Sequence, residues 1–165
     1  MNLNLKVLTS EDVMQEYVDW FKDYDVIKYS DNQYKEFTLE GQKRYVQDCN
    51  FSNDIALFGI FDSEKHIGNI SLTGLLSIHS CASVSYVIGN KKYWGKGVAS
   101  FAISEVIEKC RNTFKINKLI AGVASENIGS TKVLEKNGFK LEGIKKNHLL
   151  YDGKYYDQID YGILI

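Results

Sequence analysis

The segment Lys92-Tyr93-Trp94-Gly95-Lys96-Gly97-Val98-Ala99 decides the fold predicted for this chain. Its glycines allow consecutive backbone N–H groups to turn toward one point, and a strong helical pattern begins directly after them. A helix N-terminus carries a partial positive charge, to which Lys92 and Lys96 add full charges. The segment therefore predicts an anion-binding loop, with a phosphate or pyrophosphate as its natural ligand.

The loop also has other interpretations. A Walker loop requires Gly-Lys-Ser/Thr, which is absent, and a dinucleotide fingerprint fails because Ser100 stands where Gly or Ala belongs. A plain strand-to-helix turn stays open, as does a nucleotide-binding protein of another fold.

The elements after the loop are predicted from their periodicity. Apolar residues at helical spacing predict a helix over Val98–Cys110, and Lys118–Ala124 is typical of a strand buried on both faces. Asn127 is expected to cap a helix that stops at Gly138, followed by a strand over Phe139–Lys146. Asp152-Gly153 is the preferred type I′ turn, so a hairpin of Asn147–Tyr151 and Tyr155–Leu164 should close the chain.

The elements before the loop follow in the same way. Leu3–Val7 alternates like an amphipathic strand, and Thr9 with Asp12 resembles a capping box that opens a helix to about Asp23. An aromatic stretch, Tyr24–Phe37, precedes a helix that Thr38 caps and that ends near Asn50. Three antiparallel strands are expected over Ile55–Phe61, His66–Thr73 and Ser83–Ile88. The order β-α-α-β-β-β-α-β-α-β-β predicts an α/β (α+β) mixed sheet with helices on both faces, in one domain over 1–165.

Composition narrows the function. The 165 residues are 44% hydrophobic and 25% charged with a formal net charge of −1, so the chain as a whole offers no polyanion-binding surface and nucleic acid is a poor partner. The three cysteines have no zinc spacing, which favours a reduced, cytoplasmic protein without metal. The longest apolar run, Ile55–Phe61, is far short of the roughly 20 residues that a membrane span needs.

The loop resembles the Gln/Arg-x-x-Gly-x-Gly/Ala signature of the GCN5-related N-acetyltransferase (GNAT) family, with Lys92 at its first position. Asn127-Ile128-Gly129-Ser130 and Leu134-Glu135-Lys136-Asn137-Gly138-Phe139 resemble the second cofactor element of that family. Leu141-Glu142-Gly143 and Asp152-Gly153-Lys154-Tyr155-Tyr156-Asp157 resemble the branch of the ribosomal-protein N-terminal acetyltransferases. The resemblance covers essentially the whole chain. It implies a sheet of about seven strands with splayed central parallel strands, flanked by about four helices.

The resemblance also implies acetyl-CoA as co-substrate and direct acetyl transfer to a primary amine. The loop N–H groups should then hold the pyrophosphate, and the strand edge ending at Gly89 should pair with the pantetheine arm. A backbone N–H near Val87 or Ile88 would hold the developing oxyanion. The residues expected at the cofactor are Val87, Ile88, Gly89, Lys92, Trp94, Gly95, Lys96, Gly97, Val98, Ala99, Asn127 and Ser130.

Two catalytic side chains common in the family are absent. Leu134 occupies the position of a tyrosine that protonates the leaving thiolate in many members, and the resemblance assigns this role to Ser130 instead. Gly122 occupies the position of the glutamate base. His148 is the candidate base, directly or through water, since imidazole titrates near neutral pH. A surface histidine without a role is the competing interpretation, and His66 has a weaker claim.

The acceptor should lie between the aromatic stretch and the hairpin. Its expected lining is Tyr29, Asp31, Tyr34, His79, Tyr155 and Asp157. His66-Ile67-Gly68-Asn69-Ile70, with His79, also resembles acetyltransferases of surface-polysaccharide pathways, which favours an amino-sugar nucleotide; a protein N-terminus comes close behind. A non-catalytic module that binds acetyl-CoA is the alternative. The expected partners are acetyl-CoA and an amine, and no membrane is expected to take part. The protein should be a monomer, or a homodimer that pairs through the Tyr155–Ile165 strand.

Overall fold

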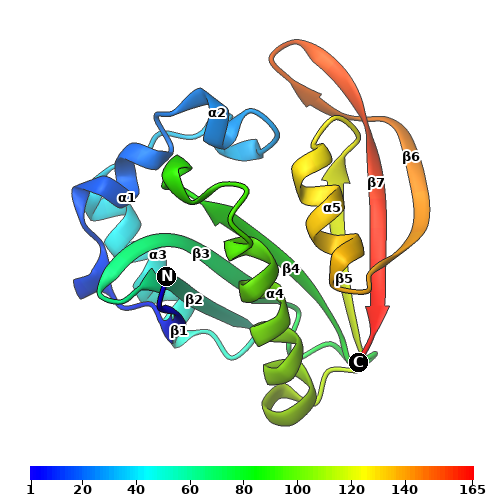
Figure 1. Cartoon of the computed structure of the whole chain (residues 1–165), viewed down its shortest axis with the longest axis horizontal. Coiled ribbons are helices and arrows are strands. Elements are labelled where there is room, and N and C mark those ends of the chain that lie inside the picture. The colour runs from blue at the N-terminus through cyan, green and yellow to red at the C-terminus, as the bar shows by residue number, and fades with distance from the viewer.

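One seven-stranded sheet organises the molecule. The computed structural model describes residues 1–165, and the strand order is β1-β2-β3-β4-β5-β7-β6 (Figure 1). All neighbours are antiparallel except β4 and β5, which are parallel. The strands are β1 (Leu3–Val7), β2 (Ile55–Asp62), β3 (Lys65–Thr73), β4 (Cys81–Ile88), β5 (Lys118–Ala124), β6 (Lys140–Tyr151) and β7 (Lys154–Leu164). The predicted mixed sheet of about seven strands is confirmed.

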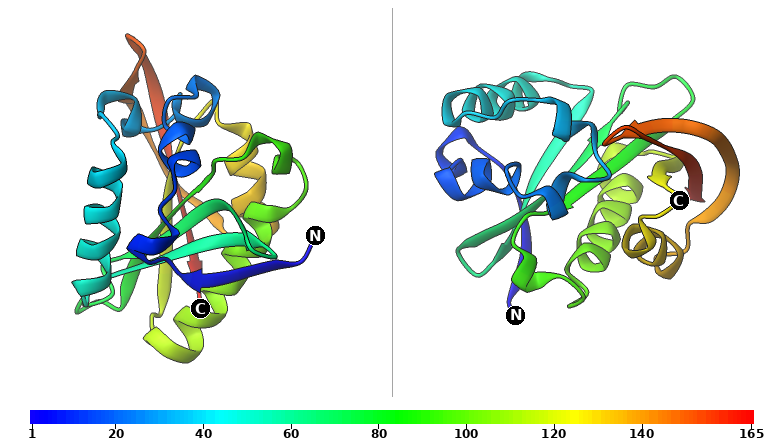
Figure 2. Two further views of the ribbon diagram at one scale, coloured as in Figure 1. Left: turned by 90° about the vertical axis from the view of Figure 1, so that its left-hand side faces the viewer. Right: turned by 90° about the horizontal axis from the view of Figure 1, so that it is seen from above.

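Helices cover both faces of the sheet. They are α1 (Gln15–Trp20), α2 (Tyr24–Ile27), α3 (Leu39–Phe51), α4 (Val98–Lys109) and α5 (Ile128–Lys136). Helices α4 and α5 lie on one face, and α1 and α3 lie on the other (Figure 2). The fifth helix, α2, is a single turn within the aromatic stretch, capped by the Asp23 side chain. No helix combines the length and the apolar character that crossing a bilayer requires.

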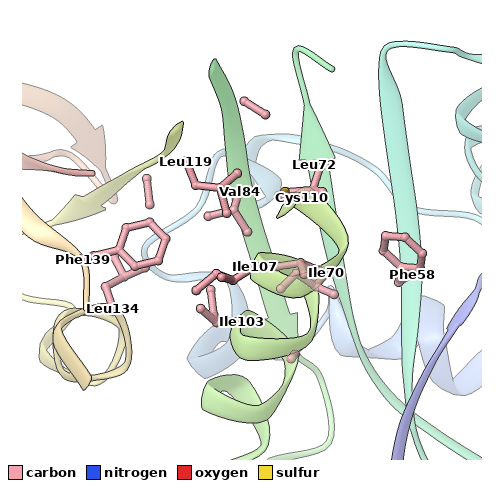
Figure 3. Packing of buried hydrophobic residues seen from close by; sticks show 14 of the residues in the cluster. Phe58, Ile70, Leu72, Val84, Ile103, Ile107, Cys110, Leu119, Leu134 and Phe139 are labelled. Atoms are coloured by element: carbon pink, nitrogen blue, oxygen red, sulfur yellow. The ribbon is translucent and has the colours of Figure 1, made fainter. Parts of the chain in front are cut away.

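Each face has its own core because side chains alternate along the strands. In β2, Phe58 and Ile60 join the larger cluster beneath α4 and α5, whereas Leu57 and Phe61 join the smaller cluster beneath α1 and α3. Ile103 is fully buried in the larger cluster (Figure 3). Burying one such side chain stabilises the fold by about 1.5–3 kcal/mol.

The central parallel pair separates along its length. Pairing of β4 with β5 is confined to Cys81–Lys118, Ala82–Leu119 and Ser83–Ile120. Beyond Ser83 the two strands run apart, as Figure 1 shows. The predicted splay is thereby confirmed, and the β5-facing edge of β4 from Val84 to Ile88 has no strand partner. We call this gap the β4–β5 opening.

The helix predicted from Thr9 to about Asp23 is interrupted. The Asp12 carboxylate accepts hydrogen bonds from the Thr9 backbone N–H and hydroxyl, as the capping pattern indicated. Only a 3-10 turn, Ser10–Asp12, follows this cap, because Val13 and Met14 are extended and α1 begins at Gln15. Val13 is 1% exposed, and the extended backbone turns its side chain into the smaller cluster.

The C-terminal strands differ from the prediction in two ways. The segments predicted separately as Phe139–Lys146 and Asn147–Tyr151 form the single strand β6, with irregular pairing between Lys145 and Leu149. Strand β7 lies between β5 and β6, so the expectation that Tyr155–Ile165 is an exposed edge is wrong. The hairpin turn is as predicted, since Asp152 and Gly153 have φ of 49° and 72°.

Candidate active site

The loop between β4 and α4 presents unpaired backbone donors. Gly95 and Gly97 take φ of 71° and 81°, in the left-handed region that favours glycine. Gly97 is the N-cap of α4 and has no side chain to bond the first turn. The N–H groups of Val98, Ala99 and Ser100 have no partner, since the first capping bond runs from Phe101 to the Gly97 carbonyl. This arrangement suits a pyrophosphate, as the sequence predicted.

Ion pairs and hydrogen bonds fix the start of this loop. The Lys91 ammonium lies 2.7 Å from a carboxylate oxygen of Asp23 and 3.1 Å from one of Asp25. Hydrogen bonds to these two carboxylates raise the pKa of Lys91, so its charge is permanent at neutral pH. The Tyr93 hydroxyl donates to Asp62 at 3.0 Å. The loop is therefore anchored to the α1–α2 turn and to the end of β2.

Trp94 adds a third anchor through its side chain. Its indole Nε1–H donates to the Ile88 carbonyl at 2.7 Å, which folds the loop back onto the last residue of β4. Lys92 and Lys96, in contrast, form no ion pair with a carboxylate within 4.0 Å. Two uncompensated cations thus stand beside the free N–H groups of α4.

The free edge of β4 exposes alternate backbone groups. The Gly89 N–H donates to the Ile67 carbonyl, so the antiparallel alternation directs the N–H and C=O of Val87 toward Asn69 in β3. Those of Tyr86 and Ile88 point into the β4–β5 opening. Of the two donors predicted for the oxyanion, Ile88 is therefore available, and Val87 is not because the sheet uses its N–H.

The first turn of α5 borders the same opening. Asn127 is its N-cap, and its side-chain oxygen accepts from the Ser130 N–H at 3.3 Å. Leu134, at the position of the family tyrosine, is 1% exposed and packs in the larger core cluster. Ser130 neighbours the Tyr86 side chain of β4 and therefore lies at the opening, whereas Leu134 packs in the core.

Two hydrogen bonds of Asn137, which the sequence did not indicate, connect helices α4 and α5. The Asn137 side-chain N–H donates to the Ser100 hydroxyl at 2.9 Å and to the Val133 carbonyl at 2.7 Å. In the sequence, Ser100 is noticeable only as a mismatch to the dinucleotide fingerprint. No local pattern indicates that it contacts a residue 37 positions later. The contact fixes the N-terminus of α4 against α5.

The aromatic stretch and the hairpin tip meet, as predicted. The Tyr34 hydroxyl donates to the Leu150 carbonyl at 2.6 Å, and the Tyr151 hydroxyl donates to Asp31 at 3.2 Å. The ring of Tyr29 lies edge-on to Tyr156, with 5.9 Å between centroids. Three of the residues expected at the acceptor, Tyr29, Asp31 and Tyr34, therefore form one wall with the hairpin.

The other three residues expected at the acceptor are placed differently. The Asp157 carboxylate accepts from the Lys146 ammonium at 2.7 Å and from the Asn147 N–H at 2.9 Å, so it holds the irregular part of β6. Tyr155 is 60% exposed near the tip of the hairpin. His79 precedes β4 at the paired end of β4 and β5, opposite to the loop, and the structure does not bring it to the opening.

No free carboxylate takes the place of the missing glutamate. Gly122 pairs with Asp160, and a Cβ at Gly122 would meet the Gln158 side chain at 2.9 Å. Burial opposes ionisation of Asp160, but hydrogen bonds from Gln158 and Lys145 outweigh it and lower the pKa of this carboxyl. His148 is exposed on β6, and its charge also favours ionised Asp160.

His66 lies elsewhere, in the smaller cluster. Its Nε2 is 2.7 Å from the Asn69 side-chain oxygen, and the rings of Tyr17, Trp20 and Phe61 surround it. Burial lowers the pKa of this imidazole, so it is neutral near pH 7. Its role is therefore in packing, which agrees with its weaker claim as a base.

Comparisons with known proteins agree with this geometry. A model of the acetyltransferase (GNAT) domain matches residues 2–140. A probable N-acetyltransferase of Bacillus subtilis, YjcK, is 30% identical over 145 residues, which cover 84% of this chain and 77% of that protein. The ribosomal protein uS5-alanine N-acetyltransferase of Escherichia coli is 32% identical over 106 residues, covering 62% of this chain and 54% of the relative.

Solved structures show the same fold. The spermidine N-acetyltransferase of Vibrio cholerae, in complex with CoA and spermine, has a TM-score of 0.87 at 22% identity, over 99% of this chain and 95% of that one. The ribosomal-protein-S5-alanine acetyltransferase of Vibrio fischeri has a TM-score of 0.86 at 22% identity, over 99% and 93%. The fold and the loop before α4 define an acyltransferase that uses acetyl-CoA. The chain belongs to the GNAT family and is an acetyl-CoA-dependent N-acetyltransferase.

Proposed function

We propose that the acceptor is a weakly basic primary amine, and specifically the α-amine of a peptide or protein N-terminus. The observation that carries this proposal is the lack of a strong base beside the opening. Gly122 replaces the family glutamate, and the neighbouring Asp160 is ionised with a lowered pKa. A site of this kind favours amines that lose their proton without strong assistance.

Amine basicity then separates the candidate acceptors. An α-amino group has a pKa of about 7.7–8.0, so a substantial share of it is neutral at pH 7.5. An alkylamine like that of lysine, with a pKa of about 10.4, is neutral only to about one part in a thousand. Polyamines are therefore disfavoured, and two carboxylates on the acceptor side, Asp157 and Asp160, are already engaged by lysines.

The roles in the site follow from the same proposal. The N–H groups of α4, with Lys92 and Lys96, hold the pyrophosphate, and the free edge of β4 pairs with the pantetheine arm. The Ile88 or Tyr86 N–H stabilises the oxyanion, and Ser130 lies at the thiol. His148 takes the amine proton through water, beside Asp160 on the acceptor side.

The sequence relative that acts on the alanine terminus of a ribosomal protein supports a peptide acceptor. The aromatic wall of Tyr29 and Tyr156 supports the second candidate, an amino-sugar nucleotide, because tyrosines offer a flat apolar face and a hydroxyl to a sugar ring.

The test is amine-dependent thiol release from acetyl-CoA at pH 7.5. The acceptors are a peptide with N-terminal alanine, the same peptide with a blocked terminus and an internal lysine, an amino-sugar nucleotide, and spermidine. We expect the highest kcat/KM for the free alanine terminus. A preference for the amino-sugar nucleotide would replace the peptide by the second candidate, and a preference for spermidine would contradict the argument from basicity. Binding of CoA without transfer to any amine would favour a non-catalytic module.

A further inference from the structure

Tyr86 carries a buried hydroxyl without a partner. Four side-chain polar atoms in the molecule are buried with no hydrogen bond, and the Tyr86 hydroxyl is the one among them that belongs to β4. Its ring lies on the same face of the strand as Val84 and Ile88, packed against the core beneath α4 and α5. An unpaired buried hydroxyl costs about 1–3 kcal/mol, so its retention calls for an explanation.

The hydroxyl lies close to the first turn of α5. Burial raises the pKa of Tyr86, and the neighbouring Ser130 hydroxyl acts in the opposite direction. The phenol is therefore protonated at neutral pH and is a donor rather than a base. Two hydroxyls, one from β4 and one from α5, thus converge beside the opening in which the thioester of acetyl-CoA should lie.

The attacking amine and the leaving sulfur should lie toward opposite faces of the sheet. The wall formed by Tyr29 and Tyr156 lies on the face that carries Gln158 and Asp160, from which the amine should approach. Tyr86 lies toward the opposite face, packed against the core beneath α4 and α5, and Ser130 belongs to α5 itself. The amine should attack the thioester carbonyl from the acceptor side, and the sulfur should leave on the side from which acetyl-CoA enters, where the two hydroxyls lie. Leu134, buried in the core, supplies no proton there.

We propose that Tyr86 is a catalytic residue that donates its hydroxyl proton to the coenzyme A sulfur. As the amine nitrogen forms its bond to the acetyl carbon, the carbon–sulfur bond breaks and the sulfur takes the proton of Tyr86. The phenolate regains a proton from water, and the proton released by the amine balances it. As the phenolate forms, the neighbouring Ser130 hydroxyl turns to donate a hydrogen bond to the phenol oxygen, a bond that the resting structure does not contain, and stabilises the transient charge. The proposal rests on the acetyl-CoA reaction of the family and not on the identity of the acceptor.

Binding of coenzyme A and of desulfo-coenzyme A, which lacks the sulfur, tests this contact without turnover. We expect the wild-type protein to bind coenzyme A about 3- to 10-fold more tightly than the desulfo analogue, as one hydrogen bond allows. Tyr86→Phe should abolish this preference. Tyr161→Phe is the matched control, because that hydroxyl lies in the same core cluster but already donates to Glu135 at 3.1 Å. An unchanged preference in Tyr86→Phe would overturn the proposal.

Two further measurements separate a catalytic role from a structural one. Tyr86→Phe should lower kcat about 10- to 100-fold, with the KM for acetyl-CoA nearly unchanged. It should leave the melting temperature equal or higher, because an unpaired buried hydroxyl is removed. A lower melting temperature with an unchanged kcat would show that the hydroxyl is structural and would overturn the proposal. Loss of the sulfur preference in Ser130→Ala but not in Tyr86→Phe would assign the donor to Ser130 alone.

Discussion

Gly97 shows how one backbone conformation creates the anion site. At φ 81° and ψ 4° it ends the loop and begins α4, and a Cβ built there would meet nothing within 4 Å. Gly97→Ala should therefore cost about 1–2 kcal/mol in conformational strain alone and turn the N–H groups of Val98 and Ala99 away from a common point. We expect about tenfold weaker binding of coenzyme A by calorimetry.

Gly143→Ala is the control for this prediction, since its Cβ also meets open space but its φ is not positive. The control should bind coenzyme A normally. Equal binding by Gly97→Ala and Gly143→Ala would contradict the assignment of the loop.

Trp94 positions the same loop through a single hydrogen bond. Trp94→Phe keeps an aromatic ring but removes the Nε1–H that donates to Ile88. Because the loop is displaced while the reacting groups remain, we predict a severalfold higher KM for acetyl-CoA with a nearly unchanged kcat. Steady-state kinetics with acetyl-CoA as the varied substrate measures this, and a fall in kcat at constant KM would assign Trp94 to the chemical step instead.

At the scale of single residues the sequence predicted well what depends on local pattern. Gly97, Asn127 and Leu134 were identified from spacing and resemblance, and the conformations found there agree with that pattern. Of the two residues predicted to supply the oxyanion donor, Ile88 and not Val87 points its N–H into the opening, because this direction depends on the register with β3. Tyr86 was missed although its alternation with Val84 and Ile88 was visible, because its proximity to Ser130 arises only from the tertiary fold.

Strand β4 and helix α1 illustrate packing between elements. A Cβ on Gly89 would lie 1.9 Å from the Trp20 ring, because the indole covers the end of β4. Gly89→Ala must displace this ring and should destabilise the protein by about 1–3 kcal/mol. Gly129→Ala, on the exposed surface of α5, should be neutral or slightly stabilising. Chemical denaturation of both variants checks this, and equal midpoints would contradict the contact.

The β6–β7 hairpin should respond to acid through Asp157. Hydrogen bonding from Lys146 lowers the pKa of this carboxyl below its unfolded value of about 3.9. Its contribution to stability is therefore complete above that value and is lost as pH falls through the lower, folded pKa. Acid unfolding of Asp157→Asn should show a smaller loss of stability below pH 4 than the wild type. Identical acid profiles would show that the ion pair contributes nothing.

Elements with strong periodicity were predicted nearly to the residue, and elements that depend on tertiary contacts were not. The helix predicted over Val98–Cys110 is α4, Val98–Lys109. The helix expected after Thr9 is broken at Val13 because burial of that side chain outweighs helical continuity. The join of two predicted strands into β6 depends on Asp157, which holds the irregular segment from the neighbouring strand.

In the proposed reaction, acetyl-CoA and an amine meet from opposite sides of a split sheet. Sequence pattern and resemblance predicted the splay of β4 and β5, but not the position of β7 between β5 and β6. That position directs Gln158 and Asp160 toward the acceptor side and removes the proposed edge for pairing of two copies. The acceptor site is the least predictable part, because its wall combines the segment that follows α2 with a hairpin more than 100 residues later.

Hydrogen exchange of backbone amides, measured by mass spectrometry with and without coenzyme A, tests the central claim most directly. We expect binding of coenzyme A to slow exchange at the amides of Tyr86 and Ile88 and at those of Val98 to Ser100. These N–H groups have no partner in the free protein. Unchanged exchange at both segments in a protein saturated with coenzyme A, or protection confined to the region around His66, would contradict this claim.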